Sequence, residues 1–167
     1  MNRLVLLAVV SLFALGCAPR PTATPVPVPA GTTIEIYSTA AAAGPNTKAG
    51  VDPSTNAVIN LVTPPVITTV DIATVARSEM EIETVGNAAP PYSVPSLEIV
   101  LNAAGTKKML AATTAPTSPN LAVVVNGVVI SVPNIVTPIN RSFRVTGDHG
   151  SAAYLNALAA ATGQPQG

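Results

Sequence analysis

A chain of 167 residues is long enough for one domain of ordinary size, and its 8 acidic side chains balance its 8 basic ones. Nucleic-acid binding is not expected, because no basic excess is available to neutralise phosphates. Alanine, valine, threonine and proline dominate while tryptophan is absent, so small and β-branched side chains have to build the core, which favours sheet over long helices.

The first segment is typical of a bacterial lipoprotein signal peptide. Arg3 precedes an apolar stretch over residues 4–15 that is too short to span a bilayer as a helix, and Ala14-Leu15-Gly16-Cys17 resembles a lipoprotein cleavage site. Cys17 is the only cysteine, so lipidation of its thiol explains it better than an ordinary signal peptide with an incidental cysteine.

A signal peptide is therefore expected over residues 1–16, and a membrane anchor at Cys17. This anchor predicts an extracytoplasmic lipoprotein of the cell envelope. It would face the periplasm from the outer membrane of a Gram-negative cell, and would otherwise lie on the outer face of the cytoplasmic membrane.

Proline dominates the segment that follows. Alternating prolines within residues 17–31 disfavour sheet pairing and favour extended polyproline II structure, which predicts either a tether or a disordered leader without a required length. A folded domain is expected over residues 32–163, and a disordered tail over residues 164–167.

Alternation of apolar and polar residues, or a short apolar run, predicts four strands in the first part of the domain: 33–38, 57–62, 79–85 and 96–102. In the first of them, Ile34 and Ile36 share one face. Residues 39–56 are rich in alanine, glycine, asparagine and proline and are expected to form a loop, and residues 69–76 a helical turn. Residues 86–91 are expected to form a turn, and the strands 79–85 and 96–102 are expected to be either neighbours or one long interrupted strand.

Helical spacing follows. Residues 103–114 predict a helix with Met109 and Leu110 toward the core; Gly105 costs about 1 kcal/mol relative to alanine there, so it is expected near the helix start or close against the sheet. Ser151 is expected to begin a last helix rich in alanine and leucine.

The strongest local signal lies between these two helices. Asn126-Gly127 joins the apolar runs 121–125 and 128–132, and a type I′ hairpin turn needs positive φ at both central residues. Pro133 then stops the pairing. A further strand is expected over residues 141–146, and Gly147 follows it as a turn residue. The fold class predicted is α+β, an antiparallel or mixed β-sheet with two main helices packed on one face.

Four segments, taken in order, resemble the periplasmic P1 head of SecD, the accessory subunit of the bacterial protein-export machinery. They are Pro65-Val66-Ile67-Thr68 followed by Asp71-Ile72, the strand and helix over residues 97–113 with Ala104-Gly105, the hairpin with Asn126-Gly127, Ser131 and Pro133, and Val145-Thr146-Gly147 before the last helix. Asp148-His149-Gly150 departs from the family, which commonly has a bulky apolar residue after the glycine, so this loop is expected to differ in shape.

The resemblance implies a SecD P1-head-like domain, with exported polypeptides or a Sec-type envelope protein as partners. SecD depends on transmembrane helices for its proton-coupled cycle. No comparable apolar segment follows residue 16, so neither motor nor proton-conducting activity is expected of this chain. The expected function is a lipid-anchored extracytoplasmic binding module; the alternative is a structural envelope lipoprotein that anchors or spaces a partner complex.

No enzymatic activity is expected. His149 is the single histidine, and without a second histidine or a free cysteine to complete a zinc set it is best interpreted as a polar loop residue. Ser151 lacks a G-x-S-x-G context, and the glutamates at 79, 81 and 83 predict a solvated strand face instead of an acid–base pair. No catalytic residue, cofactor or metal is predicted. The predicted site residues are Cys17 for lipidation and Asn126, Gly127, Pro133 and Gly147 as structural turns.

Overall fold

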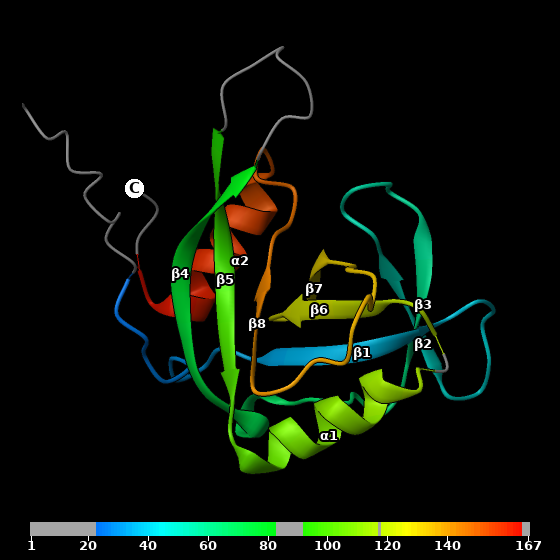
Figure 1. Ribbon diagram of the computed structural model, residues 1–167. Helices are drawn as coiled ribbons and strands as arrows, with labels where there is room; N and C mark the ends of the chain where they lie inside the picture. The colour runs from blue at the N-terminus through cyan, green and yellow to red at the C-terminus, as the bar shows by residue number, and fades with distance from the viewer. Residues whose placement is uncertain (1–22, 83–91, 117, 165–167) are drawn as a thin grey trace, which may run out of the picture.

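The computed structural model describes residues 23–82, 92–116 and 118–164 (Figure 1). Along the chain these residues form β1 (Ile34–Ala40), β2 (Thr47–Val51), β3 (Val58–Val62), the 3₁₀ helix η1 (Thr69–Asp71), β4 (Ile72–Ile82), β5 (Tyr92–Leu101), α1 (Ala103–Thr114), β6 (Leu121–Val125), β7 (Val128–Ser131), β8 (Ser142–Val145) and α2 (Ala152–Thr162). The predicted α+β class, with antiparallel strands and two main helices, is confirmed. The signal peptide, Cys17 and the turn at 86–91 lie outside the described residues.

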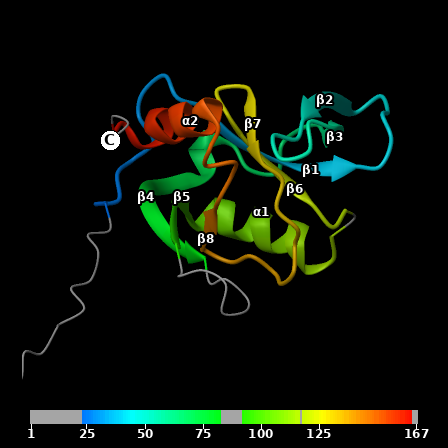
Figure 2. The ribbon, with the colours of Figure 1, turned by 90° about the horizontal axis from the view of Figure 1, so that it is seen from above.

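The strands divide into two antiparallel sheets instead of forming one. The larger sheet has the order β2-β3-β1-β6-β7 and the smaller has β4-β5-β8 (Figures 1 and 2). The interior strand β6 explains the division, because all of its residues are buried and both faces of the larger sheet must therefore be covered there. A single sheet with helices on one face would leave half of this apolar run in water.

The main hydrophobic core lies between the two sheets and is completed by both helices. Its largest fully buried side chains include Ile34, Ile36, Ile67, Leu97, Ile99, Leu101, Met109, Leu121, Ile130, Tyr154 and Leu158. The alternation seen in the sequence of β1 thus points Ile34 and Ile36 into this core.

A second, smaller core covers the opposite face of the larger sheet. It consists of Tyr37, Leu61, Ala122, Val124 and Val129. The β2–β3 hairpin folds back over these residues, so that a Cβ added at Gly50 would lie 3.0 Å from Val129 Cγ2. Lys48 of the hairpin lies over Tyr37, with its Nζ 4.2 Å from the ring centroid.

β2 lies within residues 39–56, which the sequence predicts as a loop. Three of its five residues, Lys48, Ala49 and Gly50, are poor strand formers, and they join a strand because β2 pairs with β3 from Thr47↔Val62 to Val51↔Val58. Strand propensity depends on such packing more than on the residues themselves. This correction matters for function, because the hairpin forms one wall of the cleft described below.

The helical turn predicted over residues 69–76 is correct only at its start. η1 follows Thr68, whose N–H and hydroxyl donate to the Asp71 carboxylate at 3.0 and 3.1 Å. From Ile72 onward the chain is extended, because β4 pairs with β5 as far as Ile82↔Tyr92. The strand expected at 79–85, as far as the described residue 82, and the strand expected at 96–102 belong to this longer antiparallel pair.

α1 spans the residues predicted for the first helix. The Asn102 side chain caps it by accepting hydrogen bonds from Ala104 N and Gly105 N, both at 3.0 Å. Gly105 is buried against η1, where an added Cβ would lie 2.3 Å from the Asp71 carbonyl oxygen. Lys108 donates to the Asp71 carboxylate at 2.7 and 2.9 Å, so the helix is fastened to η1 at two points.

Asn126 and Gly127 form the turn between β6 and β7, with φ of 48° and 80°. The Asn126 side chain also accepts the N–H of Thr33 at 2.8 Å, which joins the turn to the start of β1. β7 ends at Ser131, and the carbonyl of Pro133 still accepts the N–H of Leu121 at 3.0 Å.

Residues 26–31 belong to the folded domain, although the sequence predicts a tether as far as residue 31. Val26 pairs with Val75 of β4 through two backbone hydrogen bonds of 2.8 Å. Val26 and Val28 pack against the main core, and the Thr32 hydroxyl donates to the Ala160 carbonyl at 3.1 Å. Prolines at alternate positions leave one side of the segment free to pair, so the pattern that predicts a tether also permits an edge strand.

Candidate functional site

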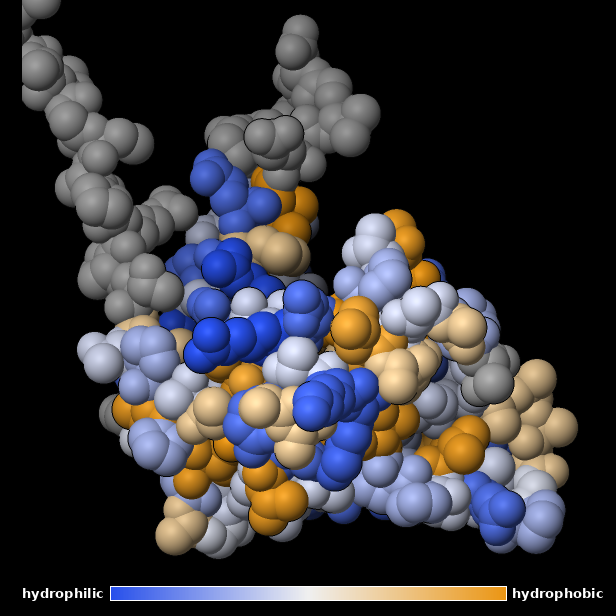
Figure 3. Space-filling model, turned by 60° about the horizontal axis from the view of Figure 1, so that its bottom comes forward, coloured by the Kyte–Doolittle hydropathy of each residue, from blue (hydrophilic) through white to orange (hydrophobic). Residues whose placement is uncertain are grey.

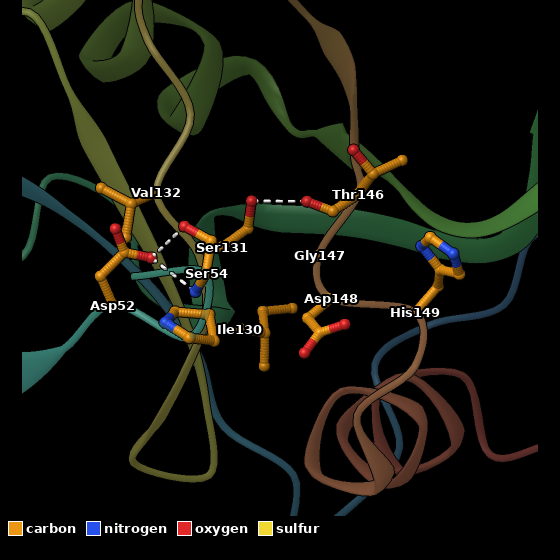
Figure 4. Close-up of a pocket in the computed structure, with 10 residues that line it drawn as sticks. Asp52, Ser54, Ile130, Ser131, Val132, Thr146, Gly147, Asp148 and His149 are labelled. Atoms are coloured by element: carbon orange, nitrogen blue, oxygen red, sulfur yellow. Dashed lines mark hydrogen bonds between the residues drawn. The ribbon is translucent and has the colours of Figure 1, made fainter. Parts of the chain in front are cut away.

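An open cleft of about 510 Å³ lies where the end of β7 meets the loop between β8 and α2 (Figure 4). The loop after β2 forms its other wall. Ten residues line it: Asp52, Pro53, Ser54, Ile130, Ser131, Val132, Thr146, Gly147, Asp148 and His149. The cleft is therefore built from three segments that are distant in the sequence.

The floor of the cleft joins the two sheets. The Ser131 hydroxyl, at the end of β7, donates to the Thr146 carbonyl at 2.6 Å, just beyond β8. The next residue, Gly147, passes so close to its neighbours that an added Cβ would lie 2.3 Å from Ile130 O and 2.5 Å from the Tyr154 ring. Glycine is needed here for close approach of the backbone, since its φ is not in the left-handed region.

The first wall is organised by Asp52. Its carboxylate accepts hydrogen bonds from Ser54 N at 2.9 Å, Ser54 Oγ at 2.8 Å and Thr55 Oγ1 at 2.9 Å. Burial raises the pKa of Asp52, but the hydrogen bonds from Ser54 and Thr55 outweigh it and hold that pKa below its usual value. Asp52 therefore presents a fixed negative charge at neutral pH.

The second wall is the start of α2. Asp148 Oδ1 accepts the N–H of Gly150 at 3.1 Å, and the Asp148 carbonyl accepts the N–H of Ser151 at 2.9 Å. Ser151 occupies the N-cap position predicted for it, without a side-chain capping bond. His149 is exposed, and its ring centroid lies 6.3 Å from that of Tyr92 in a tilted arrangement.

These groups form a hydrogen-bonding surface and are not arranged for nucleophilic catalysis. The hydroxyl of Ser54 donates to Asp52 and that of Ser131 donates to a carbonyl, so neither is paired with His149 as its base. In the part of the chain that the structure describes, no three His, Cys, Asp or Glu side chains come together in a way that could hold a metal ion. What the cleft offers a ligand is two carboxylates, hydroxyls, and the apolar side chains of Ile130 and Val132.

Of the predicted site residues that the structure describes, only one lines this cleft. Gly147 does, whereas Asn126, Gly127 and Pro133 support the hairpin beside it. The wall around Asp52 had no signal in the sequence, because nothing local indicates that a loop after β2 meets a loop after β8.

The exposed surface carries both hydrophobic and hydrophilic side chains. On the face shown in Figure 3, hydrophobic residues form small separate patches between hydrophilic ones. Apolar side chains exposed singly are ordinary on protein surfaces and indicate no partner by themselves.

Comparison with known proteins identifies the domain. A family model described as the SecDF P1 head subdomain matches residues 64–161, more than half of the chain. The chain belongs to the SecDF P1 head family. This relates the P1 head domain described here to the protein-export machinery, as the four sequence segments indicated.

Two solved structures resemble this P1 head domain. One is a crystal structure of SecDF in its super-membrane-facing form, and the other is of SecDF described as a membrane component that enhances protein export. Each has 15% sequence identity and a TM-score of 0.46 over 78% of this chain. The chain spans 19% and 63% of their respective lengths. No curated protein sequence matches it significantly.

The family match also divides the cleft. The matched residues begin after β3, so they include the floor and the 146–149 wall, whereas Asp52 belongs to the preceding hairpin. None of the helices within the described residues is long and apolar enough to cross a membrane.

Proposed function

We propose that this protein is a lipid-anchored, extracytoplasmic binding module whose P1 head domain holds extended polypeptide chains in the cleft at the end of β7. The observation that carries the proposal is the cleft itself, which combines apolar side chains with fixed hydrogen-bonding groups in a family related to protein export. Neither motor nor proton-conducting activity is part of this proposal.

The chemistry of the cleft suits a main chain better than a compact small molecule. β7 is the terminal strand of its sheet, and among the described residues no strand pairs with its outer edge, where the residues around Gly147 contact Ile130 and Ser131. An extended polypeptide offers N–H and carbonyl groups to such an edge and places alternate side chains in adjacent pockets. Ile130 and Val132 supply apolar contact, and the ionised Asp52 accepts hydrogen bonds from amides or attracts a basic side chain.

Photo-crosslinking of the full chain tests this function. We expect a photoreactive amino acid in place of His149 to crosslink a chemically unfolded, alkylated secretory protein, and not the same protein in its folded form. Val70 provides the matched position, because it is 81% exposed and does not line the cleft. Equal yields at both positions would contradict the proposed cleft, and crosslinks only to the folded form would favour a spacer role.

The anchor is tested separately. We expect Cys17→Ser to release the protein from membranes and to remove the mass of the acyl chains, because the thiol is the point of attachment in this proposal. Cell fractionation with mass spectrometry measures both effects. A variant that stays with the membrane and keeps the wild-type mass, apart from the substitution, would show that Cys17 carries no lipid.

A further inference from the structure

The outer edge of β4 is occupied by the chain's own proline-rich segment, residues 24–28. Figure 1 shows β4 at one side of the smaller sheet, with the N-terminal segment beside its lower part. Val26 N donates to Val75 O and Val75 N donates to Val26 O, both at 2.8 Å, so Val26 forms an isolated antiparallel bridge to this edge.

Pairing is limited to one residue. Among the described residues, Val26 forms the only bridge to β4 from this segment. Pro25 and Pro27 alternate with it, and their missing N–H groups belong to positions that face away from β4. The segment therefore covers the edge at one residue, through two backbone hydrogen bonds and the packing of Val26 and Val28 against the core.

The rest of the β4 edge has no strand beside it. Val75 directs both backbone groups outward, and hydrogen-bonding direction alternates along a strand, so Arg77, Glu79 and Glu81 direct theirs outward as well. No strand other than β5 pairs with these residues in the described part of the chain. Glu79 and Glu81 are exposed, which gives this end of the edge a negative face.

We propose that the β4 edge is a second polypeptide-binding site, and that residues 24–28 are its built-in competitor. The guest is an extended strand with basic residues at alternate positions, which would lie opposite Glu79 and Glu81 and would displace Val26 from Val75. The inference rests on the proposed function, since it concerns the same class of ligand. It differs in the surface, which is the β4 edge, and in the competing segment, residues 24–28.

With the competitor in place, the apparent affinity equals the intrinsic affinity multiplied by the fraction of molecules in which the edge is open. Removing one of its contacts therefore strengthens binding in trans. Val26→Pro removes the N–H that donates to Val75, and Thr32→Val removes the hydroxyl that donates to Ala160. Thr24→Pro is the matched control, because Thr24 is exposed and its N–H donates to no group of the described residues.

The test uses the full chain in detergent and a fluorescent peptide of alternating threonine and lysine, with fluorescence anisotropy for affinity. We expect Val26→Pro and Thr32→Val to bind the peptide about tenfold more tightly than the wild type. Thr24→Pro should bind it with the wild-type affinity. The same peptide, N-methylated at alternate amides, should lose binding. Amide exchange should show new protection at Arg77, Glu79 and Glu81.

Other results overturn the inference in distinguishable ways. Equal affinity of all variants, with circular dichroism showing them folded, would show that residues 24–28 do not compete. Binding that crosslinks at His149 and leaves the β4 amides unprotected would assign the peptide to the cleft, so the proposed function would stand without this site. Absence of binding to any variant would contradict both.

Discussion

Gly105→Ala separates helix propensity from tertiary packing. Alanine is the better helix former by about 1 kcal/mol, so propensity alone predicts a more stable protein. In the structure, however, the new methyl carbon would lie 2.3 Å from the Asp71 carbonyl oxygen, where ordinary contact needs more than 3 Å. The helix would have to move away from η1 by roughly 1 Å to accommodate it.

Two costs follow from that movement. Overpacking at a well-packed contact costs about 1–3 kcal/mol. The same carbonyl accepts the N–H of Asn102 at 3.0 Å, and weakening that bond costs about another 1 kcal/mol. After the gain in propensity is subtracted, we expect Gly105→Ala to lower the free energy of unfolding by about 2 kcal/mol.

Urea unfolding of the full chain, followed by circular dichroism, measures the change. Ala104→Gly is the matched control, because Ala104 is exposed in the same turn of α1 and should lose only about 0.5–1 kcal/mol from propensity. A Gly105→Ala variant as stable as the wild type or more stable would show that α1 can leave η1 without cost, and the packing argument would be wrong.

Three further results are expected. Burial raises the pKa of Asp71, but hydrogen bonds from Lys108 and Thr68 outweigh it and hold that pKa below its usual value. The ionised carboxylate therefore stabilises the fold at every pH above the unfolded pKa of about 3.9. This stabilisation is lost as the pH falls through the lower pKa of the folded state. Asp71→Asn should accordingly cost about 2 kcal/mol at pH 7 and show a shallower loss of stability between pH 5 and pH 2, measured by urea titration at each pH. Gly147→Ala should destabilise by about 2 kcal/mol or more in the same assay, because its methyl would meet a backbone carbonyl, and an unchanged midpoint would argue against the close approach. Thr113→Val should cost about 1–3 kcal/mol by leaving the N–H of Ile139, now 2.8 Å from Thr113 Oγ1, without its acceptor; a neutral result would mean that water replaces the hydroxyl.

Local chemistry in the sequence was sufficient for the elements that depend on near neighbours. Asn126-Gly127 specifies a turn because both positions adopt positive φ, and that requirement involves no distant residue. The range of α1 is likewise predicted from local residues, although of the two side chains predicted to face the core Met109 is buried and Leu110 is exposed. The ordered segments were sufficient to indicate the P1 head family before any fold was known.

The elements that depend on distant contacts were not predictable in this way. β2 is a strand only because β3 pairs with it and the second core lies beneath it, and neither condition appears in Thr-Lys-Ala-Gly-Val. Val26 becomes an edge strand only because β4 presents an open edge more than forty residues later in the chain.

The sequence by itself therefore determined the α+β class, the hairpin, both helices and the family, because each rests on local backbone preferences or on ordered motifs. Only the tertiary structure decided that the strands form two sheets, that Asp52 and His149 line one cleft, and that Val26 pairs with the edge of β4. The physical reason is that burial on both faces of β6 has to be satisfied by segments far away along the chain, and the position of those segments fixes the cleft.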